Sequence, residues 1–216
     1  MKHADVPYHG NPTNSYCALA CYTMVGQYLL PHANITFEMF GELANYKLGY
    51  VVWAFPVWKW MMDHGIRIYD QDISDMDAWS KKGVEGLKQS VSEKELEFYQ
   101  KNTYDLQQVT QQLKLVDNHP NFTYTKRKVN WSDIVNEFNK PGICDLTLDG
   151  KYLAHKEGFS VHRVVLLDIT EREVVFHNPR VDNAGAFQRE PLEHFRTAVE
   201  RLSGPEVCRY TLDQSE

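Results

Sequence analysis

The chain has 216 residues, of which 43% are hydrophobic and 24% are charged, and its formal net charge is −6. This balance is typical of a folded globular protein rather than a disordered one, and the length suits one domain of above-average size or a small core that carries an insertion. The basic surface that nucleic-acid binding requires is missing, since the one basic run, residues 126–128, predicts only a solvated turn or strand end.

The chain carries no segment typical of secretion or membrane insertion. Residues 1–13 are polar and have no apolar run of the signal-peptide kind. The most apolar stretch, residues 50–62, is too short to cross a bilayer and contains Pro56 and Lys59. The four cysteines, at positions 17, 21, 144 and 208, are not spaced as disulfide pairs. We therefore expect a soluble cytoplasmic protein with free thiols and no membrane partner.

The first third of the chain is predicted to be helical. Residues 17–30 place apolar side chains at helical spacing, Asn14 and Ser15 precede them as candidate caps, and Pro31 ends the run. Further elements follow: helices at residues 36–45 and 53–63, then a strand at 66–69.

The composition changes twice after this region. Residues 70–116 are polar and predict two peripheral helices, at 75–89 and 93–114. Residues 121–213 favour strands, and the predicted elements are a strand at 122–124, a helix at 131–139, and strands at 143–148, 160–169 and 173–177. This order predicts an α+β fold in which an N-terminal helical layer packs on a C-terminal antiparallel sheet.

Cys17 lies at the predicted start of a helix. The free amides and the dipole of a helix N-terminus stabilise a thiolate, which is the nucleophilic form of cysteine. The alternative is that Cys17 is a small buried hydrophobic residue, and this interpretation suits Cys21, one turn later, better.

His162 and Asn178 supply what a nucleophilic cysteine needs. His162 opens an apolar strand, so it projects from a rigid support as a base must. Asn178 ends the next predicted strand, and a tight turn returns it beside His162, where its side-chain oxygen would fix the imidazole tautomer. Each residue has a plain structural interpretation when taken alone, but the combination indicates a Cys-His-Asn triad.

The motifs around these residues resemble a known family. The run Val6-Pro7-Tyr8, then Asn11, then residues 17–24, is similar to the N-terminal motif of the bacteriocin-processing, double-glycine-leader peptidases and their stand-alone relatives in the papain clan. Residues 35–43, 59–69, 131–144, 162–179 and 187–195 are similar to later segments of the family in the same order. The middle of the chain lies outside this resemblance.

The resemblance implies a papain-like fold over residues 1–216, with the nucleophile in 1–69, a helical insertion at 70–120, and the base and Asn in 121–216. It implies that Asn11 occupies the oxyanion-hole position, where the family has the longer Gln, and Asn14 is a second candidate donor. A cleft between the helical and sheet layers would take a peptide or amide substrate.

Two other groups of residues have competing interpretations. His3, His9, Cys17 and Cys21 fit none of the usual zinc spacings, so we expect no metal site and no cofactor. Trp53, Phe55, Trp58 and Trp60 line either a substrate groove or, more simply, the core.

These observations lead to one main hypothesis and two alternatives. The main hypothesis is a papain-like cysteine hydrolase that uses Cys17, His162, Asn178 and Asn11. The alternatives are an acyltransferase with the same triad and a catalytically weak fold that binds a peptide or protein. Substrate identity and oligomeric state stay open.

Overall fold

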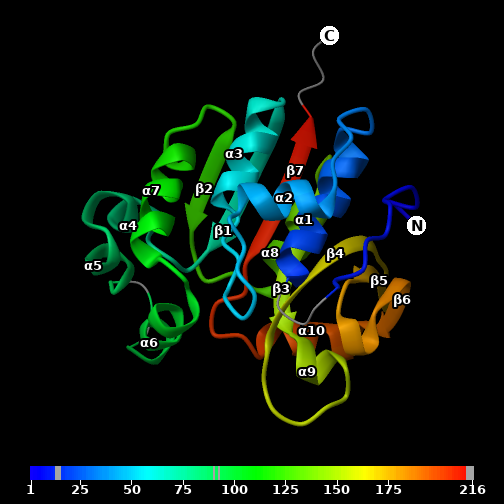
Figure 1. Ribbon diagram of the computed structural model, residues 1–216. Helices are drawn as coiled ribbons and strands as arrows, with labels where there is room; N and C mark the ends of the chain where they lie inside the picture. Colours follow the sequence, from blue (N-terminus) through cyan, green and yellow to red (C-terminus); the bar gives the residue numbers. More distant parts are fainter. Residues whose placement is uncertain (13–15, 90, 92, 213–216) are drawn as a thin grey trace.

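The computed structural model describes residues 1–12, 16–89, 91 and 93–212 and has one seven-stranded sheet at its centre (Figure 1). The strand order is β2-β1-β7-β3-β4-β5-β6, and every neighbouring pair is antiparallel except β1 with β2. The strands are β1 (Ile66–Asp72), β2 (Phe122–Lys126), β3 (Ile143–Asp149), β4 (Val161–Ile169), β5 (Glu173–Asn178), β6 (Gly185–Pro191) and β7 (Val207–Leu212). The α+β class predicted from the sequence is confirmed.

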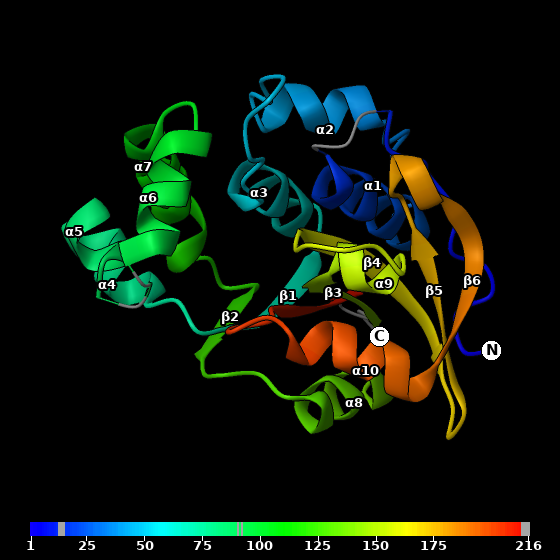
Figure 2. The ribbon, with the colours of Figure 1, turned by 90° about the horizontal axis from the view of Figure 1, so that it is seen from below.

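Helices cover both faces of this sheet (Figure 2). One face carries α1 (Cys17–Leu29), α2 (Phe37–Leu43) and α3 (Phe55–Asp63), and the other carries α8 (Trp131–Asn139) and α10 (Leu192–Glu200). Strand β4 shows how both cores form, because its side chains alternate between the faces. Val165 and Leu167 belong to the core with α1, whereas Val164 and Leu166 belong to the core with α10.

Helix α1 places Cys17 at its first position. Its residues from Leu19 to Gly26 are buried, and the helix stops at Leu29, before Pro31, as the sequence predicts. The residue before Cys17 is Tyr16, whose side chain makes no cap hydrogen bond. The predicted caps Asn14 and Ser15 lie outside the described residues.

The middle of the chain differs from its prediction. Its described residues form four helices rather than two: α4 (Met76–Lys82), α5 (Val84–Leu87), α6 (Glu93–Asn102) and α7 (Leu106–Asp117). Gly83, with a positive φ of 65°, separates the first pair, and the Asp105 side chain caps α7. The expectation of purely peripheral helices was wrong, because Trp79 and Leu113 are almost completely buried in the core with α1.

The sheet and the C-terminal region also differ from the prediction in three respects. Strand β1, from the first third of the chain, pairs with β7 from the last, so the helical and sheet regions are not segregated along the sequence. Strand β2 is parallel to β1 at the edge. Five C-terminal elements were not predicted: α9 (Gly150–Leu153), the 3₁₀ helix η1 (Val181–Asn183), β6, α10 and β7. No helix in the described part of the chain is long and apolar enough to cross a membrane.

Candidate functional site

The structure brings Cys17, His162 and Asn178 together. Cys17 begins α1, His162 is the second residue of β4, and Asn178 is the last residue of β5. On one side the His162 side chain acts on the Cys17 thiol, whose pKa it lowers by its charge and by hydrogen bonding. On the other side, its Nε2 lies 2.8 Å from Oδ1 of Asn178. His162 and Asn178 are buried, whereas Cys17 is partly exposed.

The orientation of the Asn178 amide determines the imidazole tautomer. Nδ2 of Asn178 donates to the carbonyl oxygen of Asn183 at 2.9 Å and to Oε1 of Gln188 at 2.8 Å. Oδ1 therefore faces His162 and also accepts the Arg180 backbone N–H at 3.1 Å. Because this oxygen can only accept, Nε2 of His162 carries the proton, and Nδ1 is the nitrogen left for the thiol.

Gln188 is held as firmly as Asn178. Its Nε2 donates to the carbonyl oxygen of Asn183 at 2.8 Å, so its Oε1 must be the atom that faces Asn178. Gly185 leaves the space for this arrangement, since a Cβ there would come within 2.7 Å of the Gln188 amide nitrogen. A chain of hydrogen bonds with one consistent direction thus runs from His162, the first donor, through Asn178 to Gln188 in β6 and the Asn183 carbonyl.

The environment of Cys17 favours its thiolate. Burial by itself would raise the pKa of the thiol. The charge and hydrogen bond of His162 outweigh this effect, together with the backbone N–H and the charge of Arg163, and lower the pKa of Cys17 from 9.0 to about 7. The thiol therefore ionises close to neutral pH.

Arg163, the residue after His162 in β4, is a buried cation that acts on the Cys17 thiol. Its Nη1 donates to Oδ1 of Asp145 at 2.6 Å, its other terminal nitrogen pairs with Glu206, and its guanidinium lies 5.5 Å from the ring of Tyr22 in α1. The side chain is 5% exposed, so its field reaches Cys17 with little screening by water.

The environments of the other three cysteines disfavour the thiolate. Cys21, Cys144 and Cys208 are buried, and burial raises the pKa of each thiol above its ordinary value. Such thiols are poor nucleophiles at neutral pH. The contrast of Cys17 with Cys21, one helical turn away, agrees with the distinction predicted from the sequence.

The N-terminal segment lies against the end of β5. The backbone N–H of Asn11 donates to the Pro179 carbonyl at 3.0 Å, and the Tyr8 hydroxyl donates to the Asn178 carbonyl at 3.1 Å. His177 secures the same segment, since its Nδ1 accepts the Phe187 N–H and its Nε2 lies 2.9 Å from the Val6 carbonyl. Asn11 is 8% exposed and is thus placed beside the strand end that carries Asn178.

Gly150 makes room for His162. A Cβ at position 150 would come within 2.5 Å of the His162 Cβ and 2.6 Å of Nη1 of Arg180. The loop after Gly150 is fixed by the buried Asp149, whose Oδ1 accepts backbone N–H groups from residues 151, 152 and 160.

The predicted aromatic cluster belongs mainly to the core. Phe55 and Trp58 are 3% and 1% exposed, and Trp53 packs against Phe55 and Trp79 while its Nε1 donates to Thr103. Trp60 is partly buried and packs against Phe40.

The weak zinc pattern of the sequence does not form a site. The ring of His3 packs against Phe138 and that of His9 stacks on Phe37, and neither groups with Cys17 or Cys21 within the described part of the chain.

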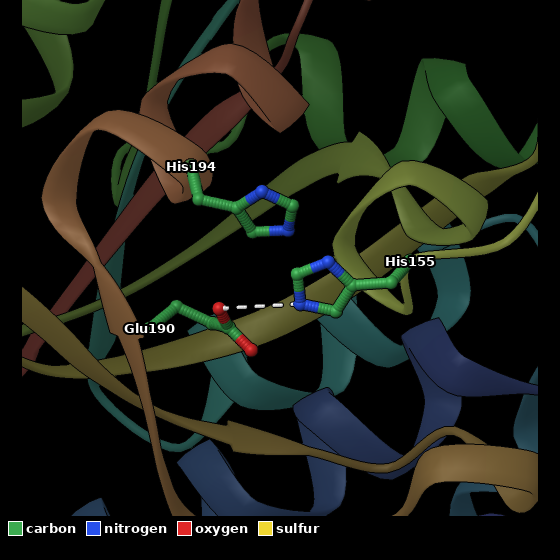
Figure 3. Close-up of side chains that lie close together, drawn as sticks. All are labelled: His155, Glu190 and His194. Atoms are coloured by element: carbon green, nitrogen blue, oxygen red, sulfur yellow. Dashed lines mark ion pairs between the residues drawn. The ribbon is translucent and has the colours of Figure 1, made fainter.

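Two other groups in that part of the chain bring three metal-ligand atoms within 4.8 Å of one another. The group of Asp70, Glu206 and Cys208 is buried beside the Arg163 guanidinium, which pairs with Glu206 and lies 3.8 Å from the Cys208 sulfur. Burial also raises the pKa of Asp70 well above its ordinary value. A cation already neutralises this group, so it is poorly suited to a metal. The second group is His155, Glu190 and His194 (Figure 3).

Sequence reasoning missed Arg163, Gln188 and Gly150. Arg163 follows His162 directly, and a cation inside an apolar strand was a signal that it needs a buried partner. Gln188 and Gly150 carry no such signal, because a polar strand residue and a loop glycine are common everywhere.

Neither a scan against models of known protein families nor a search of curated proteins finds a match to this chain.

Proposed function

We propose that this chain is a papain-like cysteine hydrolase that cleaves peptide or amide bonds with Cys17 as nucleophile, His162 as base and Asn178 as the residue that orients His162. The observation that carries this proposal is the hydrogen-bond chain that begins at His162, beside a thiol of lowered pKa, and is donated through Asn178 to Gln188. A buried structural cysteine requires neither the oriented imidazole nor the lowered pKa.

The reaction follows from the positions of these atoms. The Cys17 thiol passes its proton to Nδ1 of His162, and the sulfur forms a bond to the acyl carbon of the substrate. The tetrahedral intermediate then breaks its C–N bond, and His162 returns the proton to the leaving amine. Water, deprotonated by His162, attacks the thioester, which releases the carboxylic acid and restores the thiol.

The N-terminus of α1 supplies candidate oxyanion donors. The first backbone N–H of α1 that donates to a carbonyl one turn earlier is that of Ala20, which donates to the Tyr16 carbonyl at 3.0 Å. The amides of Cys17 and the next two residues therefore have no acceptor in the helix. The Cys17 amide and the Asn11 side chain are the two donors that we assign to the developing oxyanion.

The residues that precede His162 favour a substrate with an apolar side chain. Phe159 is 56% exposed and Val161 is 60% exposed, although both are hydrophobic. Exposed apolar side chains that flank a candidate catalytic residue are suited to bind an apolar group of the substrate.

One observation favours a second function, the binding of a peptide with weak catalysis. Asn11 is one methylene shorter than the Gln of the family that the sequence resembles, and its backbone is fixed by Pro179. A donor held short of the oxyanion would slow acylation without preventing binding.

Acylation by p-nitrophenyl acetate tests the proposal without knowledge of the natural substrate. We expect a burst of nitrophenol and the addition of one acetyl group at Cys17, observed by mass spectrometry of the intact and digested protein. Cys17→Ala should abolish the burst, and Cys21→Ala, its matched control in the same helix, should retain it. Acetylation that is equal in the wild type and in Cys17→Ala would refute the proposal.

The fate of the acetyl group distinguishes hydrolysis from acyl transfer. Hydrolysis predicts release of acetate at a rate that added glycine amide does not change. An acyltransferase predicts faster loss of the acetyl group and formation of acetylglycine amide. An acetylated Cys17 that stays stable for hours would instead support the weakly catalytic binding module.

A further inference from the structure

Two imidazoles and a carboxylate converge on one surface of the molecule. His155 follows α9, Glu190 lies in β6, and His194 lies in the first turn of α10, as Figure 3 shows. Nε2 of His155 lies 3.9 Å from Oε2 of Glu190, and one ligand atom of each residue lies within 4.8 Å of the other two.

His194 is held in place on the floor of this cluster. Its ring stacks between those of Tyr152, at 4.8 Å, and His155, at 4.2 Å, and the Arg201 guanidinium lies over Tyr152 at 4.9 Å. Its Nε2 is shielded from solvent and has no hydrogen-bond partner among the described residues. A buried ring nitrogen without a hydrogen-bond partner costs folding free energy unless another group binds it.

His155 is the exposed member of the cluster. Its side chain is 68% exposed, so its ring can turn without disturbing the core. Its backbone has a φ of 53°, in a region where residues other than glycine are uncommon, and hydrogen bonds around it hold the turn. The ring borders an open hollow of about 360 Å³ that Glu157 also lines.

We propose that His155, Glu190 and His194 bind a divalent transition metal, with zinc as the best match. Two histidines and one glutamate form a known zinc ligand set that leaves positions open for water or a fourth ligand. In such a site the ligand atoms are separated by roughly 3.3–3.5 Å, since each bond to zinc is about 2.0–2.2 Å long. The atoms therefore have to approach one another by about 1 Å, which requires the exposed His155 ring to turn out of its stack on His194 and the Glu190 side chain to move as well.

The charges nearby permit a cation. Lys156 lines the same hollow, but its Nζ forms an ion pair of 2.6 Å with Asp182. Glu190 contributes negative charge within the cluster, and Glu157 contributes negative charge from the lining of the hollow, and both favour a cation.

A bound ion would connect α10 to two segments that adjoin the candidate catalytic residues. Glu190 lies two residues after Gln188 in β6, and His155 lies in the loop between Gly150 and β4, which carries His162. Metal binding should therefore stabilise this part of the sheet, whether or not the chain is a hydrolase.

Calorimetry with zinc on untagged protein tests the proposal. Cys17→Ser serves as the parent, because it removes the one cysteine that is partly exposed. We expect one ion per chain and a melting temperature that rises by about 5–10 °C when free zinc exceeds the Kd a hundredfold. His155→Ala, His194→Ala and Glu190→Gln should each weaken binding at least about tenfold, since loss of a mere supporting residue costs that much in zinc sites.

His32→Ala is the matched control, because His32 is an exposed histidine outside the cluster. It should bind zinc as the parent does. Cobalt substitution gives a second readout, in which the visible absorption band should disappear in His194→Ala. Equal zinc affinity in the parent and in all three cluster variants would overturn the proposal, and so would binding that only His32→Ala reduces.

Discussion

Nε2 of His162 lies 2.8 Å from Oδ1 of Asn178, and both side chains are buried at the junction of β4 and β5. Because the Asn178 amide donates through its nitrogen to Asn183 and Gln188, this contact has only one direction. The imidazole is thus held in the tautomer that leaves Nδ1 free for Cys17. The same imidazole lowers the pKa of the Cys17 thiol.

The first prediction concerns the reactivity of Cys17 with iodoacetamide. With a pKa of about 7 against 9.0 for an ordinary thiol, about a tenth of Cys17 is ionised at pH 6, compared with about a thousandth of the ordinary thiol. The lower pKa also makes each thiolate about tenfold less nucleophilic. We therefore expect alkylation roughly tenfold faster than that of glutathione at pH 6, with an inflection near pH 7.

Mass spectrometry of labelled peptides assigns this rate to a residue. Cys21→Ala should leave the profile unchanged, because Cys21 is buried and the pKa of its thiol is raised. A profile for Cys17 that inflects near pH 9, or that matches glutathione at pH 6, would contradict an activated thiolate.

The second prediction concerns Gln188, which positions Asn178 without touching the thiol. Gln188→Ala frees the Asn178 amide to turn, so His162 loses its fixed tautomer. We expect acetylation of Cys17 to slow about 10- to 100-fold, the size of effect that loss of an orienting partner has in comparable sites. Gln188→Glu keeps an acceptor for Asn178 and should be less impaired. A purely structural role predicts equal loss in both variants and no change in the pH profile.

The sequence predicts well what depends on local pattern. The start of α1 at Cys17 and its end before Pro31 follow from apolar periodicity and a helix breaker, and α8 agrees with its predicted range of 131–139 because Asn130 caps it. The pairing of His162 with Asn178 was predicted from two neighbouring strands and the turn between them.

The parts that were missed depend on distant pairing. Strand β1 pairs with β7 across more than a hundred residues of sequence, and no local sequence pattern predicts this pairing or its register. Helix α7 is mostly polar but buries Leu113 against α3, and its few apolar positions do not reveal this burial in the sequence. The cluster of His155, Glu190 and His194 is spread over a turn, β6 and α10, and its spacing of 35 and 4 residues matches no local motif.

The third prediction ranks the groups that lower the pKa of Cys17. His162 contributes more than Arg163 does, both by charge and by hydrogen bond. His162→Ala should therefore return the alkylation inflection to pH 9 or above, whereas Arg163→Met should raise it by a smaller amount. Arg163→Lys, which keeps the charge, should lie closest to the wild type. An inflection that moves more in Arg163→Met than in His162→Ala would reverse this ranking.

The fourth prediction uses Gly150 to displace His162 without altering any polar group. In Gly150→Ala the new methyl group would lie 2.5 Å from the His162 Cβ and 2.6 Å from Arg180, so one of them must move. We expect Cys17 to lose most of its rapid alkylation at pH 6 while the far-ultraviolet circular dichroism stays native. Gly10→Ala is the control, because its nearest contact is an ordinary 3.7 Å to Tyr8. Equal alkylation rates in the two variants would show that Gly150 does not set the position of His162.

The last prediction concerns the pH dependence of stability through His3. Burial between Tyr28 and Phe138 lowers the pKa of His3 from 6.5 to about 4, and neither ring nitrogen has a hydrogen-bond partner among the described residues. Since the unfolded chain binds this proton more readily, the free energy of unfolding should fall as pH drops from 6.5 towards 4.

Each pKa unit corresponds to about 1.4 kcal/mol, so the loss attributable to His3 at pH 4.5 is about 2 kcal/mol. His3→Phe places a ring of similar size between the same two neighbours and cannot take up the proton. Urea unfolding at pH 7 and pH 4.5 should therefore show a smaller acid loss in His3→Phe than in the wild type, whereas His32→Phe, at an exposed position, should retain the full loss. Other titrating groups cancel in this comparison, because they are common to all three proteins. An equal acid loss in the wild type and His3→Phe would mean that His3 is not held neutral by its burial.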